Sequence, residues 1–124
     1  MFRREKIDYV DLALWDSHQI VDQGDYKGKT ALSVFTSLPR GSVRLGTAGK
    51  IMTATHAAEV LDEGCDFVLL GRAAILQRDY PWQVRLNQNF KVPETPVTAD
   101  FLRTSGLSEN FIDYMNTAWT DFVA

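Results

Sequence analysis

The chain has 124 residues, the size of one ordinary domain, and 45% of them are hydrophobic, which is enough to build a core. Its 13 basic and 16 acidic residues leave a net charge of −3 without a long basic run, which argues against a general binder of nucleic acid or membrane surfaces. One cysteine rules out an internal disulfide framework, and one cysteine with two histidines gives no metal-ligand spacing. We expect a soluble, cytoplasmic protein, since no signal peptide and no apolar run of about 18 residues is present.

The first predicted element is a strand over residues 9–15, and the charged residues 1–6 are expected to trail from whatever precedes it. The polar residues 16–19 follow the strand directly. In a parallel α/β fold, a loop at the carboxyl end of a strand faces the ligand. His18 in this loop is therefore a candidate site residue, although a lone loop histidine is more often solvated or involved in capping.

A long polar loop and a helix come next. Residues 19–29 are longer than a typical strand-to-helix connection, and long loops on this face often carry substrate contacts. Residues 30–38 predict a helix that places Leu32 and Phe35 on one face, toward the sheet, and that ends at Pro39.

The stretch from Val43 to Arg72 predicts a complete βαβ unit. Short apolar runs at residues 43–45 and 67–70 have the length of strands, and residues 53–61 between them have helical periodicity. Strand, helix and strand in about 30 residues imply parallel strands joined by a right-handed crossover. Gly64 is expected to close the helix.

The helix of this unit has a predicted core face and a predicted cap. Ala57, Val60 and Leu61 recur at helical spacing, and Thr53 is a suitable N-cap. His56 falls in the first turns and is expected to be exposed. The single cysteine, at position 65 between helix and strand, is expected to be a packed small residue rather than a nucleophile.

Glycines follow both strands of the unit, Gly46 and Gly49 after the first and Gly71 after the second. Parallel α/β folds place their ligands at this position. Without a Cβ, glycine lets an anion approach backbone N–H groups, and Arg72 can add a charge-assisted, bidentate hydrogen bond to phosphate oxygens. Each residue alone could be a turn glycine or a surface arginine, but two glycine turns on adjacent strands favour an anion site. Residues 73–76 predict a short helical turn that begins where a phosphate would meet its N–H groups.

The rest of the chain predicts short helices and a connector. The helices are expected at residues 82–88, 99–104 and 109–116. Thr98 and Ser108 are suitable caps for the last two helices. Residues 91–96 contain two prolines and are expected to be extended. An apolar stripe at helical spacing in the last helix, formed by Phe111, Ile112 and Met115, is more often core or interface than a cofactor site.

Several motifs together resemble one enzyme family. They are Gly46-Thr-Ala-Gly-Lys-Ile-Met-Thr53, Ala57-Ala-Glu-Val-Leu, Gly64-Cys-Asp-Phe-Val-Leu-Leu-Gly-Arg-Ala73, Asp79-Tyr-Pro-Trp82, Pro93-Glu-Thr-Pro-Val and Leu107-Ser-Glu-Asn-Phe-Ile. With these motifs, residues 9–124 resemble the C-terminal portion of the old yellow enzyme family, the FMN-dependent NAD(P)H:flavin oxidoreductases and ene-reductases.

The resemblance implies a partial (β/α)8 TIM barrel. Residues 1–92 would supply about the last three βα units, with strands six to eight of the barrel, and residues 93–124 a C-terminal helical extension. The FMN phosphate would be held by four residues after strands seven and eight, namely Gly49, Lys50, Gly71 and Arg72. NAD(P)H would be the co-substrate of the parent enzyme.

The resemblance also implies missing parts. The N-terminal part of a family member supplies the flavin-facing and substrate-binding residues and a tyrosine proton donor, and none of these has a counterpart here. His18 and Tyr80 lie in no matching motif, so neither is assigned a catalytic role. Three strands of a barrel leave two sheet edges exposed, so we expect association with further copies or with a separate N-terminal half-barrel. An inactive, self-associating fragment and the phosphate-binding half of another TIM-barrel enzyme are the alternative functions.

Overall fold

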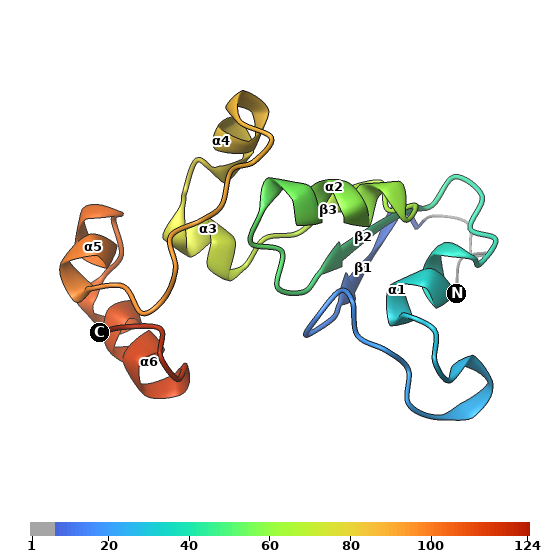
Figure 1. Ribbon diagram of the computed structural model, residues 1–124, viewed down its shortest axis with the longest axis horizontal. Helices are drawn as coiled ribbons and strands as arrows, with labels where there is room; N and C mark the ends of the chain where they lie inside the picture. The colour runs from blue at the N-terminus through green and yellow to red at the C-terminus, as the bar shows by residue number, and fades with distance from the viewer. Residues whose placement is uncertain (1–6) are drawn as a thin grey trace.

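The computed structural model describes residues 7–124, so the expectation for residues 1–6 lies outside the described part of the chain. The strands are β1 (Tyr9–Ala13), β2 (Arg44–Ala48) and β3 (Phe67–Val68). The helices are the 3-10 helix η1 (Gly24–Tyr26), α1 (Ala31–Thr36), α2 (Ala54–Asp62), α3 (Arg72–Leu76), α4 (Tyr80–Leu86), α5 (Ala99–Thr104) and α6 (Glu109–Ala118). Figure 1 shows the sheet with α1 and α2 at one end of an elongated molecule, and α5 and α6 at the other.

The three strands form one parallel sheet in the order β1-β2-β3, which confirms the α/β class and the parallel βαβ unit. β2 lies in the centre and extends beyond the predicted residues 43–45, because it pairs with a neighbour on each side. β1 ends at Ala13, two residues earlier than predicted, where the Leu14 amide turns back to donate to the Leu12 carbonyl at 2.9 Å. A partial barrel stays a prediction.

Gly46 does not belong to a ligand turn, and that prediction is wrong. It lies within β2, paired with Asp11 on one side and with Phe67 on the other. A Cβ at this position would overlap the Phe67 ring. Gly46 therefore serves packing inside the sheet, and the glycine that follows β2 is Gly49.

Helix α2 begins and ends where the sequence indicates. The Thr53 hydroxyl accepts a hydrogen bond from the His56 amide at 3.1 Å, which satisfies one of the free donors of the first turn. Gly64 follows the end of the helix with φ of +106°, a conformation that favours glycine. Ala57 and Val60 are buried, but Leu61 is 43% exposed, so its assignment to the core face is wrong. Fewer of the apolar residues of this short helix are buried than the sequence pattern predicts.

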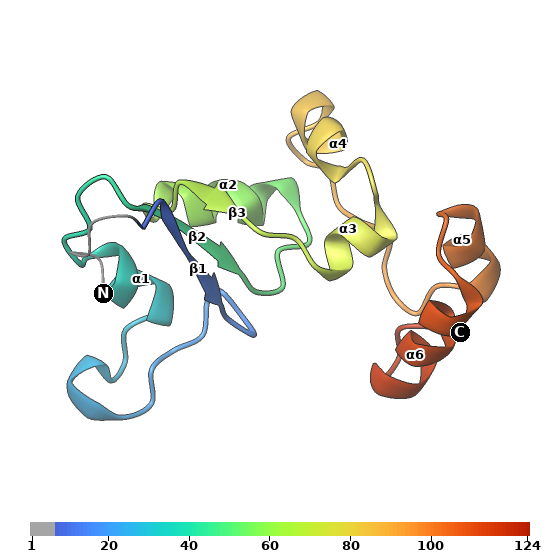
Figure 2. The ribbon, with the colours of Figure 1, turned by 180° about the vertical axis from the view of Figure 1, so that it is seen from behind.

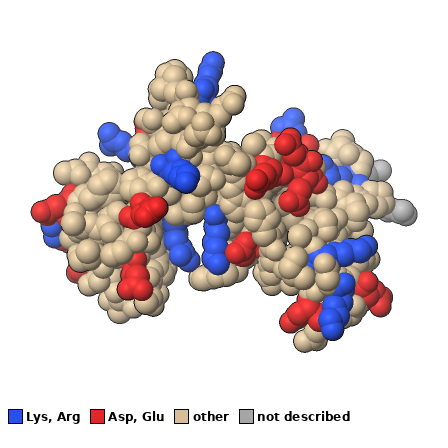
Figure 3. Space-filling model, in the orientation of Figure 1, with Lys and Arg blue, Asp and Glu red and all other residues tan. Residues whose placement is uncertain are grey.

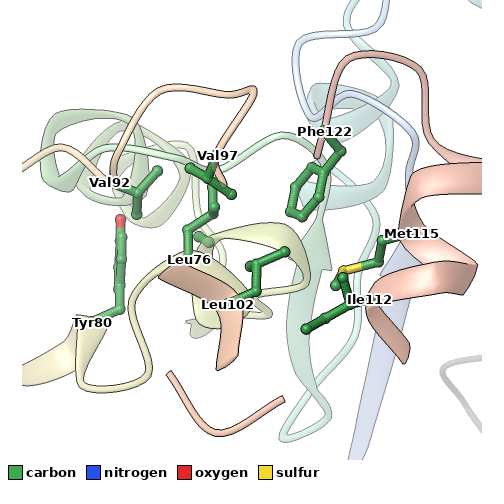
Figure 4. Packing of buried hydrophobic residues seen from close by; sticks show 9 residues of the cluster. Leu76, Tyr80, Val92, Val97, Leu102, Ile112, Met115 and Phe122 are labelled. Atoms are coloured by element: carbon green, nitrogen blue, oxygen red, sulfur yellow. The ribbon is translucent and has the colours of Figure 1, made fainter. Parts of the chain in front are cut away.

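The buried side chains form two clusters. The first lies between the sheet and helices α1 and α2, and contains Leu12, Leu32, Leu45, Ile51, Ala57, Val60 and Cys65. Cys65 is thus a packed residue, as predicted. The second cluster joins α3 and α4 to the C-terminal helices, and contains Ala73, Leu76, Tyr80, Val92, Val97, Leu102, Ile112, Met115 and Phe122 (Figure 4). This second cluster contains residues from both sides of the domain boundary that we expect between residues 92 and 93. The boundary itself stays a prediction.

The C-terminal helices follow the predicted capping pattern. The hydroxyls of Thr98 and Ser108 accept hydrogen bonds from the amides three residues later. Helix α4 begins at Tyr80, two residues before the predicted start, with Pro81 in its first turn, where proline is tolerated. Ile112 and Met115 are buried, whereas Phe111 is exposed and stacks on a neighbouring tyrosine of α6. Phe111 is therefore not a core residue, although the sequence places it in the same apolar stripe as Ile112 and Met115.

The view from behind in Figure 2 shows α3 between the two ends of the molecule, with α4 projecting to one side. The chain leaves the carboxyl end of β3 toward α3. Within residues 7–124, no helix is both long and apolar enough to cross a membrane.

Candidate anion-binding site

A cavity of about 600 Å³ opens at the carboxyl ends of β2 and β3, and Trp119 and Phe122 from the C-terminal part of the chain also line it. Gly49, Lys50, Gly71 and Arg72, the four residues expected to hold a phosphate, all line it. Much of the remaining wall is apolar, formed by Leu14, Trp15, Ile51, Met52, Leu69, Ile75, Trp119 and Phe122. Figure 3 shows basic side chains at the notch between the two ends of the molecule.

The Gly49–Lys50 turn leaves β2 in an unusual backbone conformation. Gly49 has φ of +137° and Lys50 has φ of +51°. For Lys50, which has a Cβ, this left-handed conformation costs about 1–2 kcal/mol. The Gly49 carbonyl accepts a hydrogen bond from the Ser17 amide at 3.2 Å. A Cβ on Gly49 would overlap that amide nitrogen and lie 2.8 Å from the carbonyl carbon of Asp16. The turn after β2 and the loop after β1 can therefore approach this closely only with glycine at position 49.

The ammonium of Lys50 is paired with a carboxylate. Lys50 Nζ lies 3.2 Å from Asp16 Oδ2, and both side chains are partly exposed, so the pair contributes little to stability. The pKa of Asp16 is lowered, first by the hydrogen bond from the His18 amide and then by Lys50. An anion in the cavity would share the Lys50 charge with Asp16.

Arg72 begins α3, and its guanidinium lies within cation–π distance of two indole rings. Its guanidinium carbon is 5.3 Å from the centre of the Trp15 ring and 5.5 Å from the centre of the Trp119 ring. A contact with the face of an indole ring uses none of the guanidinium's N–H hydrogen bonds, so these donors remain available for an anion. Among residues 7–124, no carboxylate forms an ion pair with this arginine.

Gly71 leaves open space beside the start of α3. Among residues 7–124, a Cβ at this position would meet no atom within 4 Å, and no side chain caps the helix. Helix α3 has only five residues, so its dipole is small and attraction for an anion must come mainly from Arg72 and Lys50. The site thus combines two cations, exposed backbone at Gly71 and an apolar wall.

Sequence reasoning missed a hydrogen-bonded cluster beside this site. His56 is partly buried rather than exposed, because its Nε2 lies 2.6 Å from Ser17 Oγ. The His18 ring stacks on the His56 ring at 4.4 Å, and His18 Nε2 is 3.9 Å from Glu59 Oε2. Burial, followed by the neighbouring His18, lowers the pKa of His56. The Ser17–His56 contact spans 39 residues, so no local pattern could have indicated it.

Neither Ser17 nor Tyr80 is placed to act on a ligand in the cavity. Ser17 is fully buried and, like His56, does not line the cavity, so the pair is not an accessible nucleophile and base. Tyr80 lies in the second core cluster, where its hydroxyl points toward Val92 and has no hydrogen-bond partner among the described residues (Figure 4). Burial raises the pKa of this phenol.

Among residues 7–124, no three His, Cys, Asp or Glu side chains are grouped to hold a metal ion. Comparisons of the chain with known protein families, with characterised proteins and with solved structures give no match. The resemblance to the old yellow enzyme family stays a prediction.

Proposed function

We propose that the chain is the FMN-binding part of an NAD(P)H-dependent flavin oxidoreductase of the old yellow enzyme type, and that it anchors the cofactor's phosphate. When bound, FMN accepts a hydride from NAD(P)H and passes it to an activated alkene or a similar acceptor. The chain has no counterpart of the family's catalytic residues, so it is not expected to perform this reaction alone.

One observation carries the proposal: the four residues expected from the motifs line a single cavity, although they come from two separate turns. Gly49 and Lys50 follow β2, whereas Gly71 and Arg72 follow β3. A phosphate beside Gly71 would meet no side chain at that position and would find the unpaired guanidinium of Arg72 next to it. These are the donor types that recognise phosphate in proteins.

The remaining lining of the cavity fits the rest of the cofactor. A volume of about 600 Å³ lies within the range of small-molecule sites. Leu14, Ile51 and Met52 give an apolar wall that suits the flat aromatic face of the flavin ring. The chain's own contribution would be to bind the phosphate and exclude water from one side of the ligand.

Comparing FMN with riboflavin tests the proposal, since riboflavin has the same ring system without the phosphate. We expect FMN to bind, to raise the melting temperature, and to bind at least about tenfold more tightly than riboflavin. Arg72→Ala should weaken FMN binding by about tenfold. Arg85→Ala is the matched control, because Arg85 lies 5.8 Å above the Trp82 ring in a similar stacking contact outside the cavity. Equal binding of FMN and riboflavin, or no FMN binding, would refute the phosphate-anchoring role.

Self-association of an inactive fragment is the second candidate, favoured by the exposed sheet edges. Within residues 7–124, β1 and β3 each pair on one side only, and Tyr9 in β1 and Trp15 just after it are 61% and 71% exposed. Unpaired edges with exposed aromatic rings favour association with another copy or with a half-barrel. Light scattering that shows a dimer or larger species, together with no thermal shift by FMN, would favour this candidate.

A phosphate-binding half of another TIM-barrel enzyme is a further proposal that the same turns support, because glycine turns after the last two strands recur in that fold. Simple sugar phosphates that bind as tightly as FMN would favour it over the flavin oxidoreductase.

A further inference from the structure

The Ser17–His56 contact ties together three segments beside the cavity. His56 lies in the first turn of α2, and Ser17 lies in the loop after β1. The Ser17 amide also donates to the Gly49 carbonyl of the turn after β2 at 3.2 Å. The hydroxyl and the amide of Ser17 therefore hold two different segments at once.

Ser17 and Gly49 are packed closely against each other, with no free space between their backbones. Ser17 is fully buried, and a Cβ on Gly49 would overlap the Ser17 amide nitrogen. Asp16, one residue earlier, binds the ammonium of Lys50 at 3.2 Å. If Ser17 moves, the carbonyl of Gly49 and the ammonium of Lys50 lose their partners together.

We infer that Ser17 and His56 are positioning residues for the anion site, which hold the Gly49–Lys50 turn in its left-handed conformation. Their effect on ligand affinity rests on the proposed phosphate site, but their effect on the turn does not. Because the pair lies outside the cavity lining, it acts through the turn and does not touch the ligand.

The groups around His56 favour its neutral form. Burial is the main reason, and His18, which stacks on the ring at 4.4 Å, disfavours a charge on His56 as well. Glu59, Asp16 and the Lys50 backbone favour the charge. The pKa of His56 is lowered overall, so protonation works against the folded arrangement, and the ring can escape the cost by leaving Ser17.

The experiment compares Ser17→Ala and His56→Gln with the native chain. Glutamine keeps a donor and an acceptor but does not titrate near neutral pH. Ser37→Ala is the matched control, since the Ser37 hydroxyl donates to the Val34 carbonyl at 2.7 Å at the end of α1, away from the cavity. Circular dichroism checks that each variant folds. Two quantities are measured: amide hydrogen exchange of residues 49–51 without ligand, and FMN affinity from about pH 7.5 to about pH 5.5.

We expect exchange at residues 49–51 to be faster in Ser17→Ala and unchanged in Ser37→Ala. On acidification, the affinity of the native chain for FMN should fall by about 3- to 10-fold more than the affinity of His56→Gln, since only the native chain protonates residue 56. Ionisation of the phosphate near pH 6 affects both proteins equally and cancels in this comparison. Identical exchange in Ser17→Ala and native protein would overturn the inference. An affinity that rises on acidification relative to His56→Gln would also overturn it, since His56 would then act as a cation that attracts the ligand. If FMN does not bind the native chain, the proposed function fails while the exchange measurement still decides the role of Ser17.

Discussion

Replacing Gly49 by alanine is expected to destabilise the protein strongly. The new Cβ would overlap the backbone nitrogen of Ser17 and lie 2.8 Å from the carbonyl carbon of Asp16. Both contacts are with backbone, so no side-chain rotation can relieve them, and the loop after β1 must move away from the turn after β2. Gly49 also has φ of +137°, which a residue with a Cβ rarely adopts.

The magnitude follows from these two terms. Left-handed strain costs about 1–2 kcal/mol and overpacking of a closely packed position costs about 1–3 kcal/mol, so the sum is about 2–5 kcal/mol. Gly28→Ala is the matched control, because Gly28 has φ of +85° but a Cβ there would meet no atom within 4 Å. Only the first term, about 1–2 kcal/mol, applies to that variant.

Urea unfolding followed by circular dichroism measures both variants, and the free energy of unfolding is extrapolated to water. Gly49→Ala should be less stable than Gly28→Ala by about 1–3 kcal/mol, and its FMN affinity should fall if the turn forms part of the site. Two variants of equal stability would show that the loops after β1 and β2 are not held in this close contact, and the reasoning about the turn would be refuted.

Three further predictions concern the core, the sheet and pH. Leu102→Ala should cost about 2–5 kcal/mol in urea unfolding, since Leu102 is fully buried in the second cluster, and a loss below about 1 kcal/mol would contradict that packing. Gly46→Ala should destabilise the sheet, because its Cβ would overlap the Phe67 ring, and Phe67→Leu in the same chain should restore part of the loss; an additive double variant would argue against this contact. The pKa of His56 is lowered in the folded protein, so the unfolded chain binds more protons near pH 6. The contribution of neutral His56 to stability is therefore complete above the unfolded pKa of 6.5 and is lost as the pH falls toward the lower pKa of the folded protein. In His56→Gln, the urea midpoint should depend less on pH between about pH 7 and about pH 5 than in the native chain. An unchanged pH dependence would show that other groups cause the loss of stability at low pH.

The sequence by itself determined the local features of the fold. Thr53, Thr98 and Ser108 cap their helices through hydrogen bonds that reach only three residues along the chain, so the pattern within a few residues is sufficient. The parallel βαβ unit was also predictable, because apolar runs of strand length around a helical pattern permit few other arrangements. The adjacent positions of Gly49, Lys50, Gly71 and Arg72 follow from that parallel pairing, since both turns then leave the same edge of the sheet.

Only the tertiary structure decided which of these residues have partners. The sequence pattern assigns Leu61 to the core face of α2, yet its side chain is 43% exposed in the described part of the chain. Gly46 was assigned to a turn, but its role depends on the Phe67 ring of the next strand.

The environment of the candidate site was likewise beyond local reasoning. The contacts of Arg72 with Trp15 and Trp119 join residues from both ends of the chain, and the contact of Ser17 with His56 joins a loop and a helix far apart in sequence. Hydrogen bonds and ring contacts of this kind depend on where the folded backbone brings distant segments together, so the periodicity and capping signals that identify each element contain no information about them.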